Sequence, residues 1–103
     1  MKTEEKTTEQ MIQEKGLTAP RLTPDDIDAL IVKEQYHVFE GTTVTICLLT
    51  LQNGYNVHGM SAAVSLENFN KEIGRKVAGE NARNEIWSLA GYALKQKLYE
   101  SLK

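Results

Sequence analysis

The stretch Thr43–Val64, with the sequence TVTICLLTLQNGYNVHGMSAAV, decides the fold of this chain. Two runs of apolar and β-branched residues flank the dipeptide Asn53-Gly54. A two-residue type I′ turn requires a positive φ at both central residues, and Asn-Gly meets this requirement at the least steric cost. We therefore predict an antiparallel β-hairpin over about residues 43–63, with Thr43–Gln52 and Tyr55–Ala63 as its strands.

A two-residue loop also predicts the register of the hairpin, because Gln52 then lies opposite Tyr55. One face would carry Val44, Ile46, Leu48 and Thr50 opposite Ala63, Ser61, Gly59 and Val57. The other face would carry Thr45, Cys47, Leu49 and Leu51 opposite Ala62, Met60, His58 and Asn56. The first face pairs large side chains with small ones, which leaves a shallow trough where a helix backbone could approach. Two strands alone are marginally stable, so we expect helices, further copies of the chain, or both to cover them.

Before the hairpin, the chain divides into an arm and a helix. Residues 1–18 are rich in Thr, Glu, Lys and Gln, which predicts a flexible charged arm with at most a short helix around Thr8–Lys15. Thr23 is a good N-cap, and Pro24 suits the first helical position. Apolar residues at helical spacing follow, so we predict a helix over about residues 24–34 that packs across one face of the hairpin. A short extended segment could follow within residues 36–41.

After the hairpin, the pattern is helical over about residues 67–101, with apolar residues at spacings of three to five. Gly74, Gly79 and Gly91 interrupt it, and glycines inside a helix indicate close backbone packing or a bend. We expect either one long bent helix or two helices parted near Trp87–Gly91. The fold class is therefore α+β, with a single domain over residues 19–103 and the element order α-β-β-α.

Composition excludes several classes of function. The net charge of −2 gives no basic field, so nucleic acid is an improbable partner. Cys47 is the single cysteine and lies in an apolar strand, so we expect a small buried residue that forms no intramolecular disulfide. No apolar run reaches membrane-spanning length, and the N-terminus lacks an apolar signal core. We expect a cytoplasmic protein with no membrane partner.

No catalytic motif is present. The pair Gly74 and Gly79 has the spacing of a phosphate loop but lacks the Lys-Ser/Thr that should follow, and it lies in a helix pattern. The sequence has no HExxH motif and no cysteine–histidine cluster, and nothing in the spacing brings His37 to His58. We therefore expect a protein that is not an enzyme and that carries neither a metal nor a cofactor.

One set of residues suggests a ligand site. Arg75, Gly79, Arg83 and Trp87 recur every four residues, so a straight helix would place them on one face. Two guanidinium groups separated by a glycine leave a gap that an anion could enter. The candidate ligand-binding residues are Arg75, Lys76, Asn81, Arg83 and Trp87, with Phe69 and Tyr92 as further aromatic groups for stacking. The alternative is that the arginines are solvated or pair with Glu72 and Glu80, and that Trp87 belongs to the core.

Three blocks of the sequence resemble a known family: Ala19–Phe39, Thr43–Val64 and Glu67–Tyr92. The most specific matches are Asn53-Gly54, Asn68-Phe69, Glu72-Ile73-Gly74, Asn81-Ala82-Arg83, Ile86-Trp87 and Gly91-Tyr92. The family comprises small proteins of tailed phages and prophages and is named after gene products forty-nine and sixty-six of two short-tailed phages. The chain departs from it at Ala90, where an acidic residue would be expected. The resemblance implies a phage or prophage source and assigns no chemistry.

Two functions from different classes remain open. The first is a phage accessory protein that binds a host component and withholds it, with a nucleotide-type, phosphate-bearing immune signal as one such component. The second is a homo-oligomer, a dimer or higher, whose apolar surfaces serve self-assembly or bind a host protein without a small-molecule ligand. Bound phosphate near Arg75 and Arg83 would favour the first, and a large apolar interface with solvated arginines would favour the second.

Overall fold

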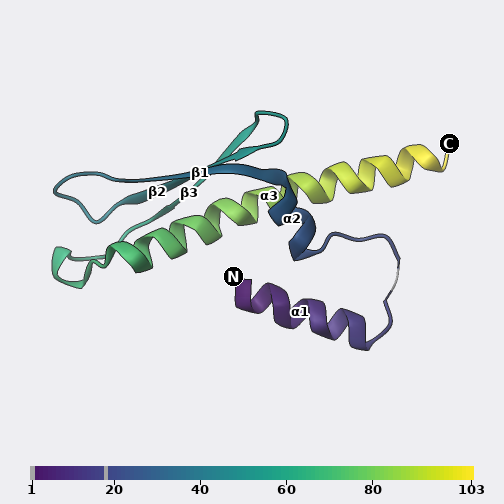
Figure 1. Ribbon diagram of the computed structural model, residues 1–103, viewed down its shortest axis with the longest axis horizontal. Helices are drawn as coiled ribbons and strands as arrows, with labels where there is room; N and C mark the ends of the chain where they lie inside the picture. The colour runs from purple at the N-terminus through teal and green to yellow at the C-terminus, as the bar shows by residue number, and fades with distance from the viewer. Residues whose placement is uncertain (1, 18) are drawn as a thin grey trace.

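The structure, a computed structural model, describes the backbone of residues 2–17 and 19–103, and side chains from residue 5 onward except those of residues 6 and 18. Its elements are α1 (Lys2–Glu14), α2 (Pro24–Leu30), β1 (Ile31–Val38), β2 (Thr45–Leu51), β3 (Asn56–Ser61), the 3-10 turn η1 (Leu66–Asn68) and α3 (Lys71–Ser101) (Figure 1). The predicted α+β class is confirmed.

The three strands form one antiparallel sheet in the order β1-β2-β3, and α3 packs against one face of it (Figure 1). Alternate residues of β2 are buried on the side of α3, namely Thr45, Cys47, Leu49 and Leu51. On the opposite side, the flanking strands present exposed residues such as His37, His58 and Met60. In the part of the chain that the structure describes, no helix covers this second face.

Only the end of β1 is predicted by the sequence, as a short extended segment within residues 36–41. The sequence analysis predicts a helix through residue 34, whereas α2 ends at Leu30 and the chain continues directly as a strand. The helix begins as predicted, with Pro24 in its first turn, because the N-cap Thr23 and the third helical residue Asp26 form a reciprocal capping box. The β-branched pair Ile31 and Val32 favours the extended backbone, and the free edge of β2 supplies the hydrogen bonds. The order is therefore α-α-β-β-β-α rather than α-β-β-α.

The predicted register of the hairpin is wrong by one residue. The Gly54 N–H donates to the Leu51 carbonyl at 2.9 Å, and the Leu51 N–H donates to the Tyr55 carbonyl at 2.8 Å, so the loop has three residues. Only glycines have a positive φ among the residues described, and Gly54 (φ +87°) is the one in this loop. Asn53 instead accepts a hydrogen bond from the Tyr55 N–H through its side chain at 3.0 Å.

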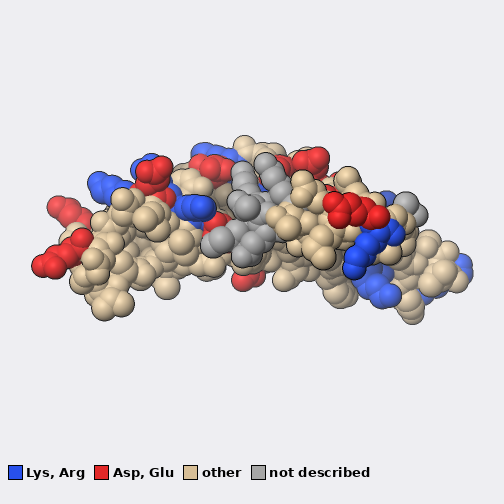
Figure 2. Space-filling model, turned by 90° about the horizontal axis from the view of Figure 1, so that it is seen from below, with Lys and Arg blue, Asp and Glu red and all other residues tan. Residues whose placement is uncertain are grey.

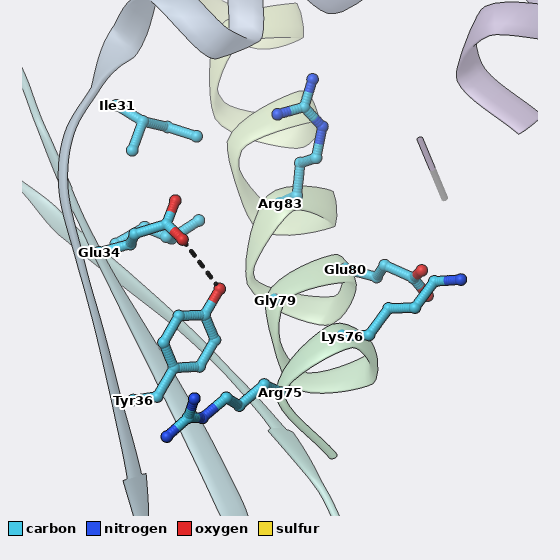
Figure 3. A pocket seen from close by; sticks show the side chains of 9 residues that line it. Ile31, Glu34, Tyr36, Arg75, Lys76, Gly79, Glu80 and Arg83 are labelled. Carbon is cyan, nitrogen blue, oxygen red and sulfur yellow. Dashed lines mark hydrogen bonds between the residues drawn. The ribbon is translucent and has the colours of Figure 1, made fainter. Parts of the chain in front are cut away.

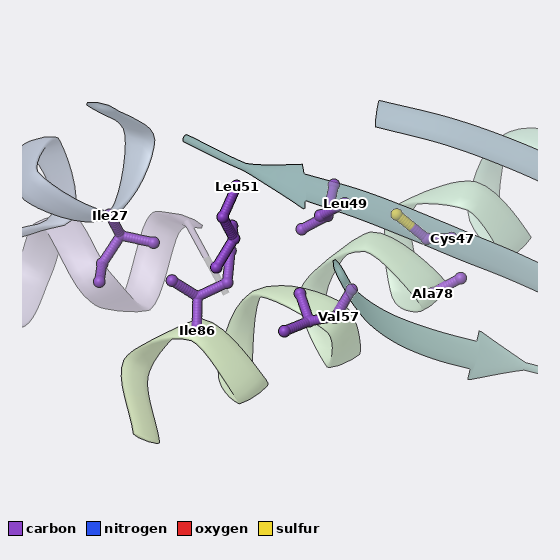
Figure 4. Packing of buried hydrophobic residues seen from close by; sticks show 8 residues of the cluster. Ile27, Cys47, Leu49, Leu51, Val57, Ala78 and Ile86 are labelled. Atoms are coloured by element: carbon purple, nitrogen blue, oxygen red, sulfur yellow. The ribbon is translucent and has the colours of Figure 1, made fainter. Parts of the chain in front are cut away.

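The corrected register places Gly59 opposite Cys47, on the face that meets α3. A Cβ atom at Gly59 would lie 2.2 Å from the Ala82 nitrogen and 2.4 Å from the Ala78 oxygen. The close approach of a helix backbone to the hairpin is thus confirmed, although on the face formed by the other pairing. Figure 4 shows the core at this contact, whose buried residues are Ile27, Cys47, Leu49, Leu51, Val57, Ala78, Ala82 and Ile86.

Helix α3 is one continuous helix of 31 residues, so the predicted alternative of two helices does not occur. Asn70 caps it, with its side-chain oxygen accepting from the Ile73 N–H at 3.0 Å. The buried residues of α3 all lie between Ala78 and Ile86. Beyond them, the helix extends past the end of the sheet (yellow in Figure 1), which gives the molecule extents of 54 × 32 × 19 Å.

The N-terminal segment contains a longer helix than expected, since α1 covers Lys2–Glu14 rather than a short stretch near Thr8–Lys15. It lies beside α2 and returns through a connection over residues 15–23 (Figure 1). The predicted boundary at residue 18 falls outside the described residues. Of the helices described, none has the length and apolar character needed to cross a membrane.

Candidate functional site

A groove of about 330 Å³ runs between β1 and α3. It forms because α3 packs against β2 and β3, while β1 overhangs the helix at the edge of the sheet. Glu34 and Tyr36 pair with Leu49 and Cys47, so they face the helix side of the sheet. Opposite them lies Gly79, where an added Cβ would stand 3.2 Å from the Tyr36 hydroxyl. The missing side chain at Gly79 therefore makes room for the tyrosine ring.

Charged groups of both signs surround the tyrosine. The Arg75 guanidinium lies 5.9 Å from the centre of the Tyr36 ring, within cation–π range (Figure 3). The Tyr36 hydroxyl donates to Glu34 Oε1 at 3.1 Å. Burial, followed by the neighbouring Cys47 and Glu34, raises the pKa of Tyr36, so the phenol stays neutral. Lys76 and Glu80 complete the charged rim of the groove.

Arg83 lines the inner end of this groove, but its donors serve other elements. Nε donates to both oxygens of Glu5, at 2.8 and 3.0 Å, one terminal nitrogen donates to Asp28 at 2.6 Å, and the other donates to the Pro24 carbonyl at 3.0 Å. Arg83 is 95% buried. Its acidic partners are therefore on α1 and α2, and not the Glu72 and Glu80 considered from the sequence.

Trp87 joins the same cluster, because its indole N–H donates to Glu5 Oε1 at 2.8 Å. Burial by itself would raise the pKa of Glu5, but the hydrogen bonds from Arg83 and Trp87 outweigh it and leave that pKa below its usual value. Burial would likewise lower the pKa of Arg83, while Glu5 and Asp28 raise it above its usual value. These contacts join α1, α2 and α3. We call the set of residues that makes them the clamp: Glu5, Asp28, Arg83 and Trp87.

The structure brings only part of the predicted set together. Arg75, Lys76 and Arg83 line the β1–α3 groove, and Gly79 opens it. Asn81 lies on the other side of α3, where its amide donates to the Met60 carbonyl at 2.8 Å. Phe69 packs beside Gly74 at the start of α3, and Tyr92 is 72% exposed on the projecting half of the helix. The predicted face of α3 covers residues 75–87, but only its residues 75–83 line the β1–α3 groove.

Sequence analysis missed Glu34 and Tyr36 as groove residues. A signal for Tyr36 was the alternation of Tyr36 and Val38 with the polar His37, which is typical of a strand. Glu34 left no such signal. The partner strand could not be named without knowing which edge of the hairpin is free. Among the residues described, no group of three or more histidine, cysteine or acidic side chains is arranged to hold a metal ion.

A second groove, of about 360 Å³ and mainly apolar, lies where α3 leaves the sheet. The hairpin loop forms one wall through Leu51 and Tyr55, and α3 forms the other through Leu89 and Ala93. Leu89 and Tyr55 are 43% and 57% exposed, so both walls of this groove carry a large apolar side chain that is partly open to solvent. This groove is continuous with the projecting half of α3.

Residues 22–98 match the family described as "Phage protein (N4 Gp49/phage Sf6 gene 66) family". The chain belongs to this family. The resemblance of the three sequence blocks is thereby confirmed, and the matched segment contains α2, the whole sheet and nearly all of α3. Helix α1 lies outside it. Neither the curated proteins nor the solved structures contain a match to the chain.

Proposed function

We propose that this phage accessory protein works as a homo-oligomer, most simply a dimer, without catalytic activity of its own and in the cytoplasm of the bacterial host. The supporting observation is that the chain exposes more solvent-accessible surface area than a compact monomer of its mass. The chain exposes 7620 Å², whereas a compact monomer of 11.6 kDa exposes about 5,800 Å². Its radius of gyration of 16.4 Å likewise exceeds the roughly 13 Å of a compact domain of this length.

This excess of exposed area is large enough to form a protein–protein interface. It amounts to roughly 1,800 Å² per chain, whereas a standard protein–protein interface buries about 800 Å² per partner and obligate dimers bury more.

The projecting half of α3, residues 87–101, is the surface that we assign to self-association. It extends for about 22 Å, and an isolated helix of that length is only marginally stable in water. Leu89, Tyr92 and Tyr99 are 43%, 72% and 53% exposed. In a twofold pair, this half would lie in the apolar groove beside the hairpin loop of the partner, and the same contact would occur twice.

Analytical ultracentrifugation of the purified chain tests this proposal. We expect a mass of at least twice 11.6 kDa at micromolar concentration. Leu89→Asp should shift the population to monomer, because it places a charge in the apolar contact. Val64→Asp is the matched control, since Val64 is fully exposed in the connection after β3 and lies far from the proposed contact. A monomeric wild type, or equal masses for both variants, would refute the assignment.

A second candidate function rests on the β1–α3 groove, which would bind a phosphate-bearing, nucleotide-type molecule of the host and withhold it. Among the residues that the structure describes, neither Arg75 nor Lys76 forms an ion pair, so both are free to bind a phosphate. Tyr36 offers an aromatic face beside them. Figure 2 shows acidic and basic residues interspersed on one face of the molecule, with wide uncharged areas between them, and no basic patch suited to a nucleic acid.

Calorimetric titration with ADP tests this second candidate. We expect heat of binding with the wild type and its loss with Arg75→Ala, whereas Lys95→Ala, on the projecting half of α3, should bind as the wild type does. Arg83 is unsuitable as the test position because its substitution would break the clamp. The absence of binding by the wild type, or equal binding by both variants, would remove this function.

A further inference from the structure

We propose that Arg83 and Trp87 form a binding site for a carboxylate group of a partner protein, and that this chain fills the site with its own Glu5. Helix α1 would then be a displaceable plug. The donor geometry is the first support. Oε1 of Glu5 receives hydrogen bonds from Arg83 Nε and Trp87 Nε1, both at 2.8 Å, and Oε2 receives a second contact from Arg83 Nε at 3.0 Å.

The site is built without α1. α2 holds the two terminal nitrogens of Arg83 through Asp28 and the Pro24 carbonyl, so the guanidinium is positioned by contacts that do not involve α1. The Nε–H is the donor of the guanidinium that α2 does not engage, and it points to Glu5. These residues all lie within the family-matched segment 22–98, whereas Glu5 lies outside it. The family domain thus positions the donors, and the appended helix supplies the acceptor.

The appended helix is held mainly by polar contacts. Among the side chains described in α1, none is fully buried, and Met11 is 51% exposed. Besides Glu5, the described part of α1 is anchored by an ion pair of Glu9 with Arg21, in which both oxygens of Glu9 accept from the guanidinium. A cavity of about 420 Å³ between α1 and α2 leaves the contact loosely packed. A competing helix would therefore displace little apolar packing of the α1 side chains that the structure describes.

The acidic residues around Arg83 limit which chemical group of a partner could replace Glu5. Asp25 and Asp28 line the cavity around Arg83, together with Glu9 of α1. A dianionic phosphate would face repulsion from these acidic groups, whereas a single carboxylate reproduces the charge that the site holds now. The occupant present is a glutamate on a helix, so the partner that fits is an acidic side chain on a helical segment of another protein.

Trp87 provides the measurement, because it is the single tryptophan of the chain. The probe is a synthetic peptide with the sequence of residues 2–14, and its control carries Glu5→Gln. The receptor is the full-length chain with Glu5→Gln, and a second receptor carries Glu5→Gln with Glu9→Gln so that both anchors of α1 are weakened. We expect the peptide with the glutamate to shift Trp87 emission and to bind at least tenfold more tightly than its control.

The wild-type chain serves as a further receptor in the same experiment. Its own Glu5 competes at the millimolar effective concentration typical of a tethered group, so the peptide should bind it at least tenfold more weakly than it binds the variants. Equal affinity of both peptides for the variants, or no binding to either variant, would overturn the proposal. A change of mass on Glu5→Gln alone would also overturn it, since α1 would then be exchanged between copies. Dimerisation through Leu89 is measured separately, so the two proposals can fail independently.

Discussion

The two halves of α3 make opposite use of the same helix. The inner half presents small residues, Ala78 and Ala82, to Gly59 of the sheet, and its backbone approaches the hairpin closely. The outer half leaves large apolar residues exposed, such as Leu89 at 43% and Tyr92 at 72%. The comparison teaches that one helix can bury its apolar residues against its own sheet over one half and leave large apolar residues exposed for another molecule over the other half.

The largest expected effect comes from filling the inner contact. Gly59→Val should lower the free energy of unfolding by about 3 kcal/mol or more, because its side chain would overlap the backbone at Ala78 and Ala82, which cannot rotate away. Urea denaturation followed by circular dichroism measures this loss. A fully stable Gly59→Val chain would show that α3 is free to move away from the sheet.

The second prediction compares one apolar residue from each half. Ile86→Ala should lower the free energy of unfolding by about 2–5 kcal/mol, because Ile86 is completely buried and its truncation leaves a cavity. Leu89→Ala should cost less than about 1 kcal/mol at low protein concentration, since Leu89 is 43% exposed in the single chain. Denaturation at several protein concentrations separates the two residues. An effect of Leu89→Ala that grows with concentration would locate Leu89 in an interface.

The third prediction concerns the clamp at the boundary between the halves. The pKa of Glu5 is lowered in the folded chain, so its contribution to stability is present above the ordinary carboxyl pKa and is lost as the pH falls through the lowered value. Trp87 emission followed from pH 7 to pH 3 should therefore change in the acid range as α1 is released. In Glu5→Gln this transition should be absent. The same transition in both proteins would assign the change to another group.

The smallest expected effect is at Gly91, in the outer half. No heavy atom lies within 4 Å of a Cβ built there, in contrast to Gly59. Gly91→Ala should therefore raise the free energy of unfolding by up to about 1 kcal/mol, because alanine favours the helix. Thermal unfolding measures the gain. Destabilisation by this substitution in a dilute, monomeric sample would mean that the outer half packs against part of its own chain.

The hairpin shows how far sequence reasoning reached in this fold. Asn53-Gly54 correctly indicated the turn and both of its strands. It did not indicate the loop length, because a two-residue and a three-residue loop both use a glycine with positive φ at this point. The choice depends on which side chains of the hairpin meet α3, and that packing places Gly59 against Ala78 and Ala82.

In the candidate site too, some features follow from the sequence and others depend on the tertiary structure. Helical spacing correctly placed Arg75 and Gly79 on one face of α3, where they meet the groove. It could not show that Tyr36 would face Gly79, since this depends on the pairing of β1 with β2. Nor could it show that Arg83 would bind Glu5, which lies 78 residues away in the sequence.

The sequence by itself determined the α+β class, the turn at Gly54, the capped start of α2 and the long helical segment, because these features depend on interactions between residues close together in the chain. The tertiary structure alone decided the register, the third strand, the partners of Arg83 and the half of α3 that is left uncovered. Each of these depends on contacts between distant segments, whose energies are set by packing and burial and leave no local pattern to read.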